Sequence, residues 1–73
     1  MSYKIKFSDI TIGDQVNLRG GFGKDPSCLG LVTNLEENGK NGQDIVDYVT
    51  EQGVTHWAYM HQVDSIAQKA VTL

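Results

Sequence analysis

Cysteine, proline and long apolar runs are nearly absent from this sequence, and their scarcity excludes several protein classes. Cys28 is the only cysteine, so the chain has neither an intramolecular disulfide nor a cysteine-based metal site. No segment approaches the roughly 18 consecutive apolar residues that a membrane span requires. The first residues also lack the apolar run of a secretory signal peptide. Because small secreted domains usually depend on disulfides, we expect a protein of the reducing cytoplasm without a membrane partner.

Positive charge is scarce as well. Six Lys and Arg residues stand against nine Asp and Glu residues, which gives a net charge of -3 at pH 7. The six basic residues are scattered along the chain and form no cluster. Nucleic-acid-binding domains normally carry a basic excess or one basic face, so the charge gives nucleic-acid binding no support.

Apolar and turn-forming residues are present in the proportions of a small folded domain. Hydrophobic residues make up 40% of the 73 residues and charged residues 21%, which argues against disorder. Eight glycines indicate many turns, and therefore short strands. The length suits a single domain over residues 1–73. A chain this short buries only roughly 60% of the surface that its unfolded form exposes, so we expect a thin core.

Alternation of apolar and polar residues predicts strands along most of the chain. Tyr3, Ile5 and Phe7 alternate with polar residues, and further strands are predicted at residues 15–19, 29–37, 44–50, 54–60 and 66–73, with loops at 20–27 and 38–42. The polar residues 61–65 suit a short turn or one turn of 3-10 helix. The sequence therefore predicts an all-β fold, a closed or nearly closed small barrel with one short 3-10 turn before the last strand.

The register of one hairpin decides which side chains share a face. A two-residue turn at Gln52-Gly53 would place Tyr48 opposite Trp57, with glycine at positive φ. One face would then carry Val46, Tyr48, Trp57 and Tyr59, and the other Ile45, Asp47, Val49, His56, Ala58 and Met60. Burial of apolar area favours the first face as the inner one, because it carries no charge.

Few residues are placed for catalysis or for metal binding. His56 and His61 are five positions apart, which on a strand sends them to opposite faces. Asp47 and His56 are predicted to lie diagonally on one face, where a surface ion pair is a simpler interpretation than an acid–base dyad. The glycine-rich run 20–24 lacks the following helix that a phosphate-binding loop requires. We therefore expect no enzyme, no metal, no cofactor and no small-molecule substrate.

The order of these motifs resembles the small five-stranded SH3-like barrels, including the Tudor and KOW types. The run Gly13-Asp14-x-Val16-x-Leu18 is followed by a glycine-bearing loop and two central strands, and Ala58-x-Met60 precedes a short turn that ends at Ile66. The chain is particularly similar to short bacterial proteins of the YodC kind, whose function is unknown. Residues 19–23 and Trp57-Ala58-Tyr59 also resemble small uncharacterised bacteriophage proteins. The likeness covers about residues 10–66 and implies the cytoplasm of a bacterial cell or of a phage-infected host.

The resemblance also bears on the hairpin faces and on function. In SH3-like barrels the positions of Ala58 and Met60 point inward, which would leave the large aromatic residues of the hairpin as an outer patch with the composition of a binding hot spot. This implies a non-catalytic interaction module that binds a protein partner or self-associates through a barrel face. The predicted binding residues are Tyr48, Trp57, Tyr59, Phe22 and Arg19. The alternative function is binding of single-stranded nucleic acid by aromatic stacking, and both placements of the aromatic face stay open.

Overall fold

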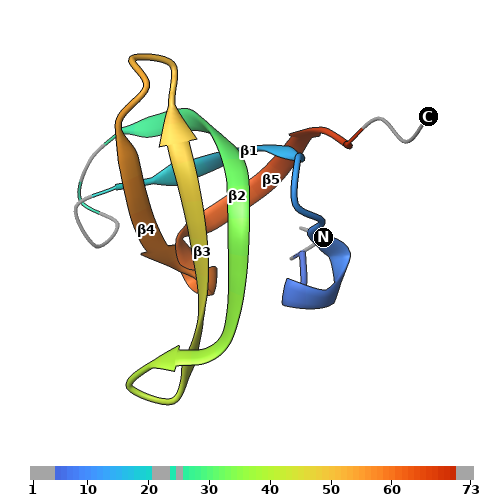
Figure 1. Cartoon of the computed structure of the whole chain (residues 1–73), viewed down its shortest axis with the longest axis vertical. Helices are drawn as coiled ribbons and strands as arrows, with labels where there is room; N and C mark the ends of the chain where they lie inside the picture. The colour runs from blue at the N-terminus through green and yellow to red at the C-terminus, as the bar shows by residue number, and fades with distance from the viewer. Residues whose placement is uncertain (1–4, 21–23, 25, 71–73) are drawn as a thin grey trace.

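The protein folds into one antiparallel sheet of five strands, seen in a computed structural model that describes residues 5–20, 24 and 26–70 (Figure 1). Its elements are η1 (Phe7–Asp9), β1 (Gln15–Arg19), β2 (Ser27–Lys40), β3 (Gln43–Thr50), β4 (Thr55–Tyr59), η3 (Met60–Gln62) and β5 (Val63–Gln68). Within these residues the only helices are the two short 3-10 turns, and neither is long or apolar enough to span a membrane.

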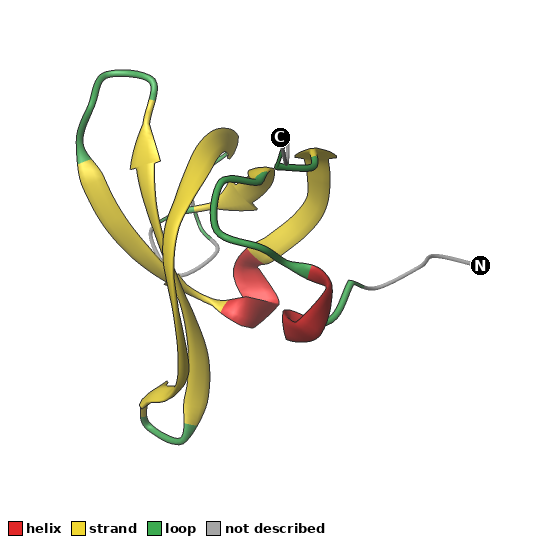
Figure 2. Ribbon diagram, turned by 45° about the vertical axis from the view of Figure 1, so that its right-hand side comes forward, coloured by secondary structure: helices red, strands yellow, loops and turns green. Residues whose placement is uncertain are grey.

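The strands are ordered β4-β3-β2-β1-β5, and every neighbouring pair is antiparallel. The central strand β2 has 14 residues and curves strongly, so that β3 and β4 pass in front of β1 and β5 (Figure 1). Both 3-10 helices lie on the same side of the curved sheet (Figure 2). In the described part of the chain β4 and β5 stay at opposite ends of the strand order and do not pair. Within these residues the sheet is therefore open, and strand pairing does not confirm the barrel predicted from the sequence.

The hydrophobic core fills the concave side of this sheet. Its buried members are Ile10, Val16, Leu18, Val32, Val46, Tyr48, Ala58 and Val63. Ile5, Phe7 and Met60 pack against this core from the two 3-10 regions and the segment before η1. Strand alternation explains the inner set on β1, because Val16 and Leu18 are fully buried while the residues between and beside them are not.

Gly30 makes room in the core for the ring of Tyr48. A Cβ atom at Gly30 would lie 2.5 Å from Cδ2 of Tyr48, which is closer than any real contact of this kind. The aromatic ring therefore occupies the space that a side chain on β2 would otherwise take. This close approach places Tyr48, only 3% exposed, inside the sheet.

Next to the turn at residues 12–13, Asp14 forms a buried junction between three parts of the chain. The Asp14 carboxylate accepts hydrogen bonds from Thr11 N at 2.8 Å, Lys69 Nζ at 2.8 Å and Ala70 N at 2.6 Å. The Asp14 carbonyl accepts from Val32 N of β2. Burial raises the pKa of Asp14. The hydrogen bonds from Lys69 and from the two backbone amides, together with the charge of Lys69, lower the pKa by more than burial raises it. The pKa of Asp14 therefore lies below its ordinary value.

The predicted strands at 15–19, 44–50 and 54–60 are confirmed to within a residue, and so is a 3-10 turn before the last strand. Strand β2 is longer than predicted and includes residues 38–40, which were expected in a loop. The predicted early strand is wrong over its described residues, because Phe7–Asp9 forms a 3-10 turn and residues 5–6 belong to no strand. The Asp9 carboxylate accepts from Lys6 N at 2.9 Å and closes that turn. Tyr3 lies outside the described residues.

The final strand begins earlier than residue 66 because Gln62 ends η3 and anchors it. The Gln62 side chain accepts from Tyr59 N at 3.0 Å and donates to the carbonyl of Arg19 at the end of β1. With both ends of this amide used, the chain leaves η3 already aligned with β1. Strand β5 therefore starts at Val63, which pairs with Leu18.

Candidate functional site

The β3–β4 hairpin has a three-residue loop, and this sets its register. Gly53 N donates to the Thr50 carbonyl and Thr50 N donates to the Val54 carbonyl, both at 2.9 Å. Gly53 takes the positive φ of 84° that closes such loops. The two-residue turn predicted at Gln52-Gly53 is therefore wrong by one residue.

This shift changes which residues share a face. Tyr48 lies opposite His56, and Asp47 lies opposite Trp57. Because side chains alternate with a period of two, a shift of one residue moves all of β4 to the other face relative to β3. Neither of the two predicted hairpin faces forms as predicted. Tyr48 and Ala58 are both buried on the inner face, whereas Trp57 lies on the outer face and is 39% exposed.

Two expectations about the hairpin are corrected by the same register. Tyr48 is buried, so it does not belong to an outer aromatic patch. Its ring lies beside His56 with centroids 5.8 Å apart. Asp47 and His56 were predicted to share a face. They lie on opposite faces, because His56 pairs with Tyr48 on the inner face and Asp47 pairs with Trp57 on the outer face. Within the described ranges, no group of three or more His, Cys, Asp or Glu side chains is close enough to hold a metal ion.

A row of aromatic side chains runs along β4 into η3. The rings of Trp57 and Tyr59 meet edge-to-face at 5.3 Å between centroids, and those of Tyr59 and His61 stack at 5.5 Å. We call Trp57, Tyr59 and His61 the aromatic row. Lys40 Nζ lies 4.9 Å from the centre of the Trp57 ring, and Asn41 donates to the Tyr59 hydroxyl at 2.9 Å. The tip of the β2–β3 hairpin therefore packs against this row.

The strand register places the aromatic row on a larger convex surface, which we call the outer face. Three lines of paired residues cross it: Gln15, Leu31, Val49 and Thr55; then Asn34, Asp47 and Trp57; then Glu36, Ile45 and Tyr59. Of these, Ile45 is buried, because the backbone of Gly39 in the hairpin tip comes against it. The remainder of the outer face combines apolar, acidic and aromatic side chains.

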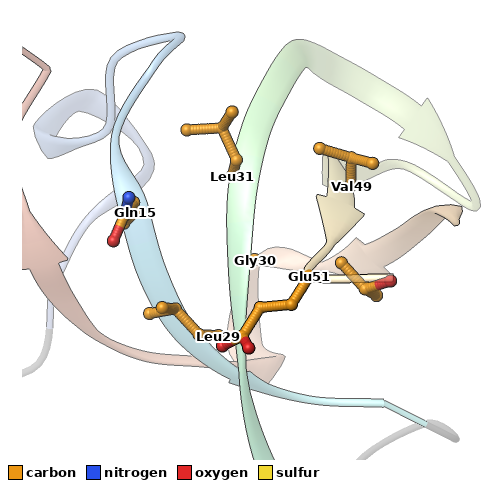
Figure 3. A pocket seen from close by; sticks show the side chains of 7 residues that line it. Gln15, Leu29, Gly30, Leu31, Val49 and Glu51 are labelled. Atoms are coloured by element: carbon orange, nitrogen blue, oxygen red, sulfur yellow. The ribbon is translucent and has the colours of Figure 1, made fainter. Parts of the chain in front are cut away.

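A shallow pocket of about 220 Å³ opens on the outer face (Figure 3). It is lined by Gln15, Leu29, Gly30, Leu31, Val49, Thr50 and Glu51. Its surface is mainly apolar, since Leu29, Leu31 and Val49 form its walls, and Leu31 remains 41% exposed. Sequence reasoning missed this pocket. A usable signal was Gly30, because an inward glycine requires Leu29 and Leu31 to point outward.

Carboxylates lie next to the apolar pocket. Glu36 and Asp47 interact on neighbouring lines of the outer face, and Asn34 donates to Asp47 at 3.4 Å. A hydrogen bond with the Asp47 carboxyl and the negative charge of that group raise the pKa of Glu36. Glu51 lines the pocket itself, and its side chain makes no hydrogen bond or ion pair with the part of the chain that the structure describes. The outer face is therefore locally acidic.

The two remaining predicted site residues lie elsewhere. Arg19 ends β1, and its Nε lies 3.2 Å from the Asp64 carboxylate, which also accepts from the Ser27 hydroxyl. Phe22 lies outside the described residues. Of the five predicted binding residues, the structure brings together Trp57 and Tyr59.

Comparison of the chain with protein-family models, with curated proteins and with solved structures gave no match. The site is therefore interpreted from its own geometry. The resemblance to SH3-like barrels and to proteins of the YodC kind stays a prediction.

Proposed function

We propose that this protein is a non-catalytic interaction module, built on an SH3-like barrel, that binds a protein partner or a second copy of itself through the outer face. The antiparallel strand order and the 3-10 turn before β5 support the barrel interpretation. The run Gly13-Asp14-x-Val16-x-Leu18 supports the same interpretation, since Val16 and Leu18 are core residues.

The observation that carries the proposal is the exposure of Leu31 and Trp57 on a face turned away from the core. Leu31 is 41% exposed and Trp57 is 39% exposed, and Leu31 forms a wall of an apolar pocket. Apolar side chains left in water beside a polar rim are typical of protein interfaces, where aromatic anchors dominate the binding energy. A chain with so few core residues gains no stability of its own by leaving Leu31 and Trp57 exposed to water.

Single-stranded nucleic acid is the second candidate ligand, favoured by Trp57 and Tyr59 on the outside with Lys40 close by. Two features of the outer face weaken it. Burial of Tyr48 removes one stacking residue, and the carboxylates of Asp47 and Glu36 would repel a phosphate backbone. We therefore place protein binding first.

The proposal is tested by removing Leu31 from the outer face. Wild type, Leu31→Ser and the control Ile12→Ser are compared by sedimentation and by quantitative pull-down from a bacterial lysate. Ile12 is a suitable control because it is 54% exposed and belongs to none of the three lines of the outer face. We expect an oligomer or a retained protein for wild type and Ile12→Ser, and its loss for Leu31→Ser. A wild type that stays monomeric and retains no protein would overturn the proposal.

A further inference from the structure

A second depression adjoins the apolar pocket. The second depression is lined by Ser27, Cys28, Leu29, Thr50, Glu51 and Gln52, and it shares Leu29, Thr50 and Glu51 with the pocket. The cause lies in the sheet: the β2–β3 ladder ends at the pair Gly30 and Thr50. Beyond that pair, the described residues of β2 pair only with β1. We call this combined depression the β2 groove.

The β2 groove has the dimensions of an extended peptide segment. It runs beside β2 from Ser27 to Leu31, and a strand rises roughly 3.3 Å per residue, so about four extended residues fit along it. Side chains of an extended segment alternate, so residues two positions apart point to the same side. A segment lying in the groove therefore presents alternate side chains to its floor.

The charges around the β2 groove select the kind of segment. Glu51 lines both depressions, and Asp47 and Glu36 follow on the next lines of the outer face. The chain as a whole carries a net charge of -3. A second copy docked by the same face would bring these carboxylates together, and a nucleic acid would add phosphates to them. A cationic partner is complementary to both the local and the overall charge.

We propose that the β2 groove binds an extended segment of a partner protein in which an apolar residue and a Lys or Arg residue stand two positions apart. This rests on the interaction function proposed above and specifies its partner. The apolar side chain enters the pocket walled by Leu29, Leu31 and Val49 (Figure 3). The basic side chain reaches the Glu51 carboxylate, for which the described residues supply no partner. Pairing of opposite charges then sets the direction and register of the bound segment.

Two libraries of short acetylated peptides test this proposal. Both carry Leu at a fixed position and a second fixed residue two positions before or after it, which is Lys in one library and Glu in the other; the remaining positions are randomised. Binding is measured on immobilised wild type, Glu51→Lys, Leu31→Ser and Ile12→Ser, with circular dichroism to verify folding. We expect wild type to bind the Lys library about threefold or more above the Glu library. Glu51→Lys reverses this preference, Leu31→Ser loses both libraries, and Ile12→Ser behaves as wild type.

The outcomes separate this inference from the function on which it rests. Equal binding of both libraries, abolished by Leu31→Ser, would overturn the basic partner and leave an interaction module. Binding of neither library by a wild type that self-associates or captures an oligonucleotide would also overturn it, in favour of those ligands. Failure of the proposed function itself is read from the sedimentation and pull-down test, as a wild type that stays monomeric and retains no protein. A preference unchanged in Glu51→Lys would remove Glu51 from the site and overturn the proposal.

Discussion

The Nζ of Lys69 lies 2.8 Å from Oδ2 of Asp14, whose side chain has no exposed surface, while Lys69 itself is 55% exposed. The ammonium group therefore covers the buried carboxylate from the solvent side. Two backbone amides, from Thr11 and Ala70, complete its hydrogen bonding. The Asp14 carboxylate therefore joins the segment before β1, through Thr11, to the segment after β5, through Lys69 and Ala70.

Acid should destabilise the fold through Asp14. The pKa of Asp14 lies below its ordinary value of 3.8, so the ionised form contributes stability above that pH. The contribution is lost as pH falls through the lower, folded-state pKa. Asp14→Asn should remove this part of the acid dependence and cost about 2–3 kcal/mol near neutral pH, because an amide cannot accept from all three donors. Urea denaturation across pH measures both effects.

The exposed Asp64→Asn is the control, and we expect it to cost about 1 kcal/mol or less in the free energy of unfolding. If Asp14→Asn loses stability in acid as the wild type does, the prediction is contradicted.

Gly30→Ala should destabilise the fold through its contact with Tyr48. The new methyl group would lie 2.5 Å from Cδ2 of a buried ring, so the ring or the strand must move. We expect a loss of about 1–3 kcal/mol in the free energy of unfolding. In a Tyr48→Leu background the same substitution should cost clearly less, because the ring is gone. Additive losses in the double variant would show that the two residues are not in contact.

Trp57 should behave as a solvent-accessible tryptophan. It is the only tryptophan in the chain and is 39% exposed, with Lys40 over one face of its ring. We expect acrylamide to quench its fluorescence efficiently in the folded protein, approaching the quenching seen in urea. Lys40→Met removes the cation beside the ring and should alter the emission at a stability change of about 1 kcal/mol or less. A blue-shifted, unquenched emission would place Trp57 in the core and contradict the register.

Glu36 should titrate above its ordinary pKa of 4.5, because the Asp47 carboxyl shares a hydrogen bond with it and repels its charge. A carboxyl group with a raised folded-state pKa favours folding in its protonated form, and this contribution is lost as pH rises through that pKa. Carbon NMR of the side-chain carboxyl groups measures the value directly. Asp47→Asn should return the Glu36 pKa towards 4.5, whereas the distant Asp64→Asn should leave it unchanged. A raised value that persists in Asp47→Asn would contradict the assigned cause.

Local sequence was sufficient to place most of the strands. In β1 the alternation of Val16 and Leu18 with polar residues has one solution, because only one pleat orientation buries both. The 3-10 turn η3 and the loop at Gly53 were also marked, the first by polar residues and the second by glycine. The short 3-10 turn at Phe7–Asp9 was not predicted, because Asp9 caps it by a contact that alternation alone does not reveal.

The sequence by itself determined that this protein is a sheet of antiparallel strands around a small core, since strand alternation and turn residues act over a few neighbours. Only the tertiary structure decided which aromatic residues are exposed. Residues 51–53 are compatible with a two-residue or a three-residue loop, and the three-residue loop is the one that leaves Ala58 buried on the same face as Tyr48 while Trp57 lies outside. The β2 groove is likewise decided by the assembled sheet, because it lies where the pairing of β2 with β3 ends at Gly30 and Thr50.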